Sequence, residues 1–142
     1  CSPHADIARQ RVAGLPREHQ GKAVIGASRA RRVCVHNLKT PEHVRYAVEH
    51  TTRGAIHYDG ALDEASLAAV RASAGNRELY VWVCYDNELT GWFKGEKASA
   101  EVCARAKRYG KLGVWILSRE DERERAEAFG AEIIETTGSL NP

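Results

Sequence analysis

The chain has 142 residues, of which 43% are hydrophobic, and it carries a formal net charge of +2. This length is typical of one domain that buries a core without disulfide or metal staples. No apolar run approaches the roughly 18 residues that a membrane-spanning helix needs, so the sequence excludes a membrane span.

Residues 1–22 are predicted to form a separate basic amino-terminal helix or arm, which Gly14 and Pro16 interrupt. Residues 1–35 carry seven basic and two acidic side chains, a local net charge of +5. Such an arm suits phosphates or an acidic surface. Nucleic-acid binding is not predicted, because stacking on bases needs aromatic side chains and none interrupts the basic positions before Tyr46.

The four cysteines form no metal or disulfide pattern, since the sequence has no C-x-x-C pair and no zinc-type Cys/His spacing. Cys34, Cys84 and Cys103 fall in apolar patterns. We interpret them as buried thiols of a reducing compartment, which predicts a cytoplasmic protein. Cys1, in a chain without methionine, indicates processing or trimming of a longer chain. A lipidated amino terminus and an amino-terminal nucleophile are the alternatives for Cys1.

Residues 23–142 are predicted to form a single α/β domain. Short β-branched or aromatic runs alternate there with helical segments of about ten residues, a pattern typical of parallel strands joined by helices. Some runs are apolar nearly throughout, as in strands that are covered on both faces. The predicted strands span residues 23–27, 33–37, 55–59, 79–86, 112–118 and 132–137.

Capping residues mark the first two predicted helices. Thr40 followed by Pro41 predicts a helix start, because threonine caps the first backbone N–H groups and proline is tolerated at the first helical position. Asp63 predicts the start of the second helix, which Gly75 ends.

Two more helices are predicted towards the carboxyl terminus. One spans about residues 97–109 and ends at Gly110. The other follows Ser118 as its cap, with Asp121 in the reciprocal capping position, and ends at Gly130.

The segment 87–97 is the one long insertion between the predicted units. It carries Trp92 and Phe93 between two glycines. Both a lid over a site and a packed surface loop are consistent with this composition.

Polar residues follow the predicted strands at the carboxyl edge, where parallel α/β proteins hold their working groups. His57 and Asp59 stand two apart in one strand, so they are expected to point to the same side, as two metal ligands or an acid and its partner require. A lone histidine at a strand end is also typical of a hydrogen-bonded structural group. The other polar residues at strand ends are His36, Asn37, Asp86, Asn87, Glu88, Ser118, Glu135, Thr136 and Thr137.

The stretch VIGASRARR resembles the glycine-rich turn of short-chain dehydrogenases. Only Gly26 of the required glycines is present, and the next predicted element is a strand rather than a helix. Dinucleotide binding is therefore not predicted.

Two longer stretches, AKRYGKLGVWILSREDERERAEAFGAEIIETTG and VCVHNLKTPEHVRYAVEHTTRGAIHYDG, resemble the end and the beginning of a glycerophosphodiester phosphodiesterase. That family forms a TIM barrel, and this chain is shorter than a full barrel by roughly 100 residues. The resemblance implies a mostly parallel α/β sheet, either a cut-down TIM-barrel-like form or an open three-layer arrangement. It also implies a metal-assisted phosphodiester hydrolase of lipid metabolism that acts on a small phosphate-containing substrate.

The resemblance assigns roles to residues at the strand ends. His36 and His57 are the implied catalytic residues, with His36 as the general acid or base. The implied ligands of a divalent metal, magnesium or calcium with manganese as an alternative, are Asp59, His57 and Glu135. The implied substrate-binding residues are Asn37, Trp115 and Thr137.

The chain departs from the family's pattern at several of these positions. Asn37 and Leu38 replace an Arg-Gly pair, His57 replaces a glutamate ligand, and no histidine follows position 57. A catalytically silent module that binds a ligand or a protein is therefore the alternative function. A homodimer is a further expectation, because a partner copy covers the edges that an open sheet leaves exposed.

Overall fold

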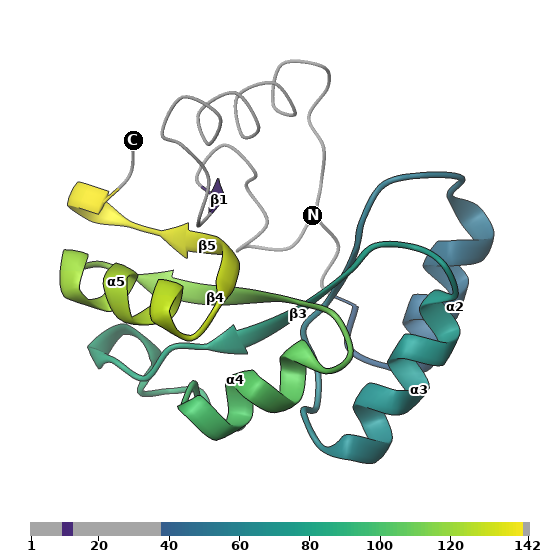
Figure 1. The fold of residues 1–142 in the computed structure, drawn as a ribbon, viewed down its shortest axis with the longest axis horizontal. Coiled ribbons are helices and arrows are strands. Elements are labelled where there is room, and N and C mark those ends of the chain that lie inside the picture. The colour runs from purple at the N-terminus through teal and green to yellow at the C-terminus, as the bar shows by residue number, and fades with distance from the viewer. Residues whose placement is uncertain (1–9, 13–37, 141–142) are drawn as a thin grey trace.

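A computed structural model of the chain describes residues 10–12 and 38–140, which form an open sheet flanked by helices (Figure 1). The strand order is β1-β5-β4-β3-β2. The last four strands in the chain are parallel to one another, and β1 runs antiparallel to β5. The strands are β1 (Gln10–Val12), β2 (Ile56–Tyr58), β3 (Leu79–Cys84), β4 (Lys111–Leu117) and β5 (Ala131–Thr136).

Helices alternate with the parallel strands, which confirms the predicted α/β class. The sheet is open rather than closed into a barrel. None of the helices in the described part is both long and apolar enough to cross a membrane. The helices are α2 (Pro41–His50), α3 (Glu64–Ala74), α4 (Ala100–Lys107) and α5 (Glu120–Ala128), and the 3-10 helices are η2 (Glu88–Thr90) and η3 (Gly138–Leu140).

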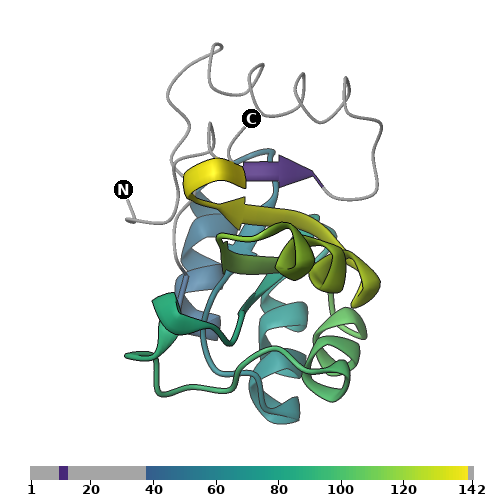
Figure 2. The same ribbon diagram turned by 90° about the vertical axis from the view of Figure 1, so that its left-hand side faces the viewer.

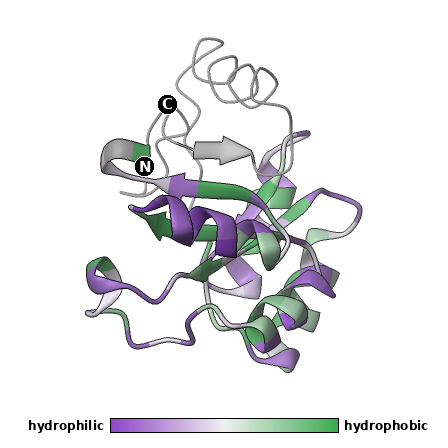
Figure 3. Ribbon diagram, turned by 60° about the vertical axis from the view of Figure 1, so that its left-hand side comes forward, coloured by the Kyte–Doolittle hydropathy of each residue, from purple (hydrophilic) through white to green (hydrophobic). Residues whose placement is uncertain are grey.

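Helices α2 to α5 share one hydrophobic core with the first face of the sheet (Figures 1 and 2). Because β2 to β5 are adjacent in chain order and each crossover has the same hand, successive helices fall on the same side. Fully buried strand residues such as Val81, Val83 and Val114 meet Leu67 and Ala106 of the helices there. Most residues of α5 are hydrophilic, whereas the neighbouring strands carry hydrophobic residues (Figure 3).

The second face of the sheet carries a separate aromatic cluster. Trp82, Cys84, Trp115 and Ile133 are all buried there. A glycine in the middle of β4 makes this packing possible, since a Cβ added at Gly113 would lie 2.8 Å from the Trp82 ring. Alternation along the strands therefore separates an aliphatic face, covered by helices, from an aromatic one.

The predicted starts of two helices are confirmed. The side-chain oxygen of Thr40 accepts a hydrogen bond from the His43 backbone N–H at 3.1 Å, and Pro41 is the first residue of α2. Asp63 caps α3 through Ser66 N at 3.0 Å. These caps satisfy backbone donors that have no partner inside the helix.

Helix α5 begins one residue later than predicted. Its N-cap is Arg119 rather than Ser118, and the reciprocal capping residue is Glu122 rather than Asp121. The physical reason is that the Glu122 side chain accepts the hydrogen bonds of the Ser118 and Arg119 backbone N–H groups, one position further along than predicted. Asp121 instead lies on the exposed side of the first turn.

Two predicted strands, 23–27 and 33–37, lie outside the described residues. At the boundary, Leu38 forms an isolated parallel bridge with Tyr58. The Leu38 N–H donates to His57 O at 3.3 Å, and Asp59 N donates to Leu38 O at 2.9 Å. Leu38 therefore lies beside β2, paired in the parallel direction that the βα pattern predicts.

Candidate ligand site at the carboxyl edge of the sheet

Buried polar side chains gather at one edge of the sheet. Within the described part of the chain, every buried polar or charged side chain lies at the carboxyl end of a strand or in the turn or first helical turn that follows one. Burying such groups is costly unless hydrogen bonds or ion pairs satisfy them. Their gathering at one edge makes this edge the candidate functional site. These residues are Asp59 after β2, Thr90 after β3, Glu122 after β4, and Glu135 and Thr136 at the end of β5.

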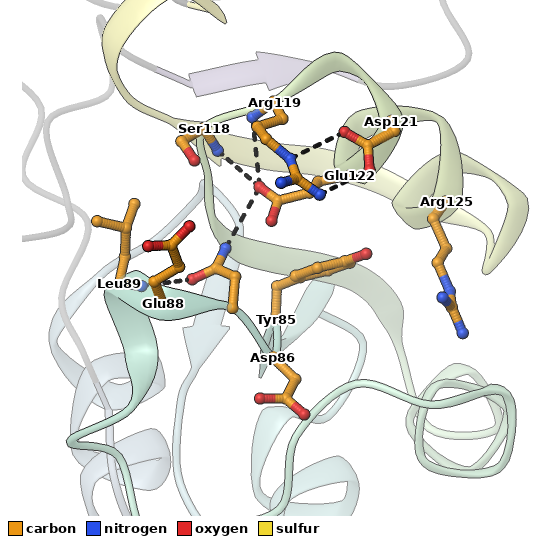
Figure 4. A pocket seen from close by; sticks show the side chains of 10 residues that line it. Tyr85, Asp86, Glu88, Leu89, Ser118, Arg119, Asp121, Glu122 and Arg125 are labelled. Atoms are coloured by element: carbon orange, nitrogen blue, oxygen red, sulfur yellow. Dashed lines mark hydrogen bonds and ion pairs between the residues drawn. The ribbon is translucent and has the colours of Figure 1, made fainter.

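An open groove of about 400 Å³ lies at the same edge, between the segment after β3 and the start of α5 (Figure 4). Its volume falls in the range of small-molecule sites. Tyr85 lies along its floor, below Glu122 (Figure 4). The lining residues are Tyr85, Asp86, Asn87, Glu88, Leu89, Ser118, Arg119, Asp121, Glu122 and Arg125.

The β3 side of the groove is fixed by Asn87. Its amide Nδ2 donates to the Ile116 carbonyl of β4 at 2.8 Å, and its Oδ1 accepts from Leu89 N at 2.9 Å. The buried hydroxyl of Thr90 donates to the Tyr85 carbonyl at 2.6 Å. One amide and one hydroxyl thus hold the turn against the neighbouring strand.

The segment 87–97 begins with this hydrogen-bonded turn, and its aromatic residues pack on the second face of the sheet. Phe93 contacts the Trp115 ring edge-on, with 5.2 Å between ring centroids. Trp92 lies 5.9 Å from Trp115 and remains 68% exposed. Its indole N–H donates to the Leu89 carbonyl at 3.0 Å.

The α5 side of the groove is fixed by Glu122, whose side chain is 5% exposed. Its Oε1 accepts hydrogen bonds from Ser118 N at 2.9 Å, from Arg119 N at 3.3 Å and from the Asn87 amide at 3.4 Å. Glu122 therefore joins the two walls of the groove. Nothing in the sequence pattern beyond an acid at the third helical position pointed to this role.

Two exposed charges at the rim of the groove bind each other. Arg119 donates to both carboxylate oxygens of Asp121, at 3.1 and 2.9 Å. This hydrogen bonding lowers the pKa of Asp121 and raises that of Arg119. On the floor, burial raises the pKa of the Tyr85 phenol.

His57, a predicted catalytic residue and metal ligand, lies on the aromatic face of the sheet rather than in the groove. Its Nδ1 accepts a hydrogen bond from the Trp82 indole N–H at 2.9 Å, and its ring stacks on Tyr80 with centroids 5.1 Å apart. Burial lowers the pKa of His57 to about 4, and the charge of Glu78 opposes that shift only in part. The imidazole is therefore neutral near pH 7.

The predicted ligands Asp59 and Glu135 are both buried, at 6% and 4% exposure. The Asp59 carboxylate lies 3.3 Å from the ammonium of Lys39. Strands β3 and β4 separate β2 from β5, so three inter-strand spacings, roughly 14 Å, lie between the two ends of the predicted set.

Within the described residues, no three His, Cys, Asp or Glu side chains form a group that could hold a metal ion. The predicted set of Asp59, His57 and Glu135 is therefore not brought together. His57 also uses Nδ1 to bind Trp82.

The comparisons give no family. No family model matches the chain, and neither the curated proteins nor the solved structures gave a match. The resemblance to glycerophosphodiester phosphodiesterases stays a prediction.

The remaining predicted site residues divide into two groups. His36 and Asn37 lie outside the described residues. Trp115 is 4% exposed within the aromatic cluster, so its ring packs in the core of the second face. Thr137 follows β5 directly, where its backbone N–H donates to the Leu117 carbonyl at 2.9 Å.

Proposed function

We propose that the chain is a binding module that holds a small ligand at the carboxyl edge of its sheet. The observation that supports this proposal is a groove at this edge that is lined by a buried carboxylate, Glu122. Ligands of open parallel sheets bind beyond the carboxyl ends of the strands, where connecting segments supply polar groups.

His57 is poorly suited to act as a general acid or base, which favours a binding function over hydrolysis that depends on this histidine. The indole N–H of Trp82 is only a donor, so the Nδ1 that it binds carries no proton. A general acid or base works best with a pKa near the operating pH. With its pKa near 4 and Nδ1 bound, His57 serves better as a structural link between β2 and β3.

Phosphodiester hydrolysis assisted by a divalent metal is the second candidate function. Its support is the burial of two carboxylates, Asp59 and Glu135, at strand ends where the resemblance places metal ligands. Buried acids in such positions are often functional. This candidate depends on His36 as the acid or base, since His57 is bound to Trp82.

One experiment separates the two candidates. The full chain is incubated with glycerophosphodiesters and an activated phosphodiester, with magnesium, calcium, manganese or chelator. The variants His36→Ala, Asp59→Asn and His57→Gln are tested in parallel. A binding module gives no turnover above buffer in any sample that is folded by circular dichroism.

Turnover that is lost with chelator and in both His36→Ala and Asp59→Asn would overturn the binding proposal in favour of the hydrolase. The ligand-binding proposal has its own test. Amide chemical shifts of the labelled chain are followed while small cations, phosphate and glycerol phosphate are added. If none of these probes moves signals at the strand ends, the proposed site is wrong.

A further inference from the structure

We propose that the groove takes a small organic cation with N–H donors, a primary ammonium or a guanidinium, and that Oε2 of Glu122 is its acceptor. This inference rests on the proposed ligand-binding function and names the ligand class. A deeply buried carboxylate, one oxygen of which faces an open groove, is the feature that carries it (Figure 4).

The two oxygens of Glu122 have different surroundings. Oε1 accepts all three hydrogen bonds, from Ser118 N, Arg119 N and the Asn87 amide. Among the described residues, Oε2 accepts none. Figure 4 shows this second oxygen directed towards the space above Tyr85. This oxygen is open to the groove while the rest of the side chain is buried, so a ligand N–H can reach it and form a charge-assisted hydrogen bond there.

The nearest cations of the described part are engaged elsewhere. Arg119 forms a bidentate pair with Asp121. The guanidinium of Arg125 lies over the Phe129 ring, 5.7 Å from its centroid, and points away from Glu122 (Figure 4). Neither side chain neutralises Oε2 of Glu122, so a cationic ligand can bind to this oxygen.

The charge of the groove agrees with a cationic ligand. Its lining contains four acidic and two basic side chains. Asp86 lies 3.5 Å from Lys97, while Glu88 makes no ion pair within the described residues and stands on the wall opposite α5. A cation entering between these walls meets two carboxylates, Glu88 and Glu122.

The same geometry disfavours an anion. Helix starts often bind anions through their free backbone N–H groups. Here Glu122 itself occupies the N–H groups of Ser118 and Arg119. An anion would therefore have to displace a carboxylate that is already bound.

The floor suits the carbon chain or the flat face of such a cation. The Tyr85 ring lies along the bottom of the groove (Figure 4). Aromatic faces attract ammonium and guanidinium groups, and Tyr85 would supply this contact while Glu122 accepts the N–H.

The test is a titration of the full labelled chain, followed by amide chemical shifts. Agmatine, which carries an ammonium and a guanidinium, is the main probe. Butylamine is compared with butanol, which has the same chain without the charge. We expect agmatine and butylamine to shift the signals of residues 85–89 and 118–122 with saturation, and butanol to leave them unchanged.

Glu122→Gln is the decisive variant, because its amide oxygen can keep the three capping hydrogen bonds while the charged second oxygen is lost. We expect the agmatine affinity to fall about tenfold or more, as for the loss of a charge-assisted hydrogen bond. Glu120→Gln is the matched control. It removes a carboxylate from the same helical turn, outside the groove lining, and should keep the affinity within about twofold.

Three outcomes would overturn the inference, and a fourth would overturn the proposed function with it. The first is equal binding of butylamine and butanol by the unmodified chain, a comparison that needs no variant. The second is unchanged agmatine affinity in folded Glu122→Gln. The third is a shift of strand-end signals by phosphate or glycerol phosphate but not by agmatine, which would retain the proposed function and reject this ligand class. No response to any probe would reject both.

Discussion

His57 and Trp82 join neighbouring strands through a side-chain hydrogen bond, from the indole N–H to Nδ1 over 2.9 Å. Since the indole N–H is only a donor, this hydrogen bond determines the tautomer of His57. Nδ1 is unprotonated and Nε2 carries the proton. Stacking of His57 on Tyr80 extends this contact along β3. A protonated imidazole would place an N–H against an N–H, so the fold binds the neutral form.

Acidification is expected to destabilise the fold through His57. Burial lowers its pKa from 6.5 to about 4, so between these values the unfolded chain binds a proton that the folded chain does not. The stabilisation is complete above pH 6.5 and falls as the pH drops towards 4. The linkage amounts to about 3 kcal/mol at most. Urea unfolding at pH 7 and at pH 4.5 measures it.

The matched control for this pH effect is His57→Gln, which has no titrating ring. We expect the variant to be less stable at pH 7 and to lose less stability between pH 7 and pH 4.5 than the unmodified chain. An equal loss in both proteins would assign the acid sensitivity to other groups.

Trp82→Phe is expected to lower the free energy of unfolding by about 1–3 kcal/mol, because it leaves Nδ1 of a partly buried histidine without its donor. The aromatic volume is largely kept. If the bond contributes as proposed, combining Trp82→Phe with His57→Gln should cost less than the sum of the two single changes. Additive costs would show that the bond contributes nothing.

Gly113→Ala is expected to destabilise the sheet by about 1–3 kcal/mol, because the added methyl group would overpack a filled core. Its Cβ would lie 2.8 Å from the Trp82 ring, and this ring is held by His57 and cannot retreat freely. Gly91→Ala is the control, since its Cβ would meet nothing closer than 3.9 Å. Chemical denaturation of both variants tests the contrast, and equal midpoints would contradict it.

The sequence predicted those parts of the fold that depend on local signals. The caps Thr40 and Asp63 are recognisable because a helix start needs an acceptor within three residues. The four described parallel strands were predicted by alternation of apolar runs with helical periodicity. The shift of the α5 cap by one residue shows the limit, because Arg119 is not a typical capping residue and Glu122 rather than Asp121 accepts from the backbone N–H groups before the helix.

The candidate site was harder to predict because it depends on contacts that are distant in sequence. The choice of His57 and Asp59 followed from the spacing of two in a strand, which says nothing of Trp82 on the next strand or of Lys39 before α2. Glu122 was missed since its bond to Asn87 joins two segments 35 positions apart. Asp59, Glu135 and Thr136 were expected among the polar residues at strand ends and are buried there, but the sequence did not indicate which side chains share a groove.

Asn87→Ala is expected to affect both stability and the groove. The change removes the donor to the Ile116 carbonyl and the acceptor for Leu89 N, so we expect a loss of about 1–2 kcal/mol. It also removes one donor to Oε1 of Glu122 and loosens the wall that carries Glu88. We therefore expect weaker agmatine binding together with larger amide shift changes in residues 86–90 than in α5.

Asn87→Asp separates these two effects. The aspartate keeps an oxygen that can accept from Leu89 N, but it replaces the amide donor with a charge beside the Glu122 carboxylate. Repulsion between the two acids should make this variant less stable at pH 7 than Asn87→Ala, which introduces no charge. Denaturant midpoints of the two variants at pH 7 measure the effect. Equal midpoints would show that position 87 and Glu122 are not coupled.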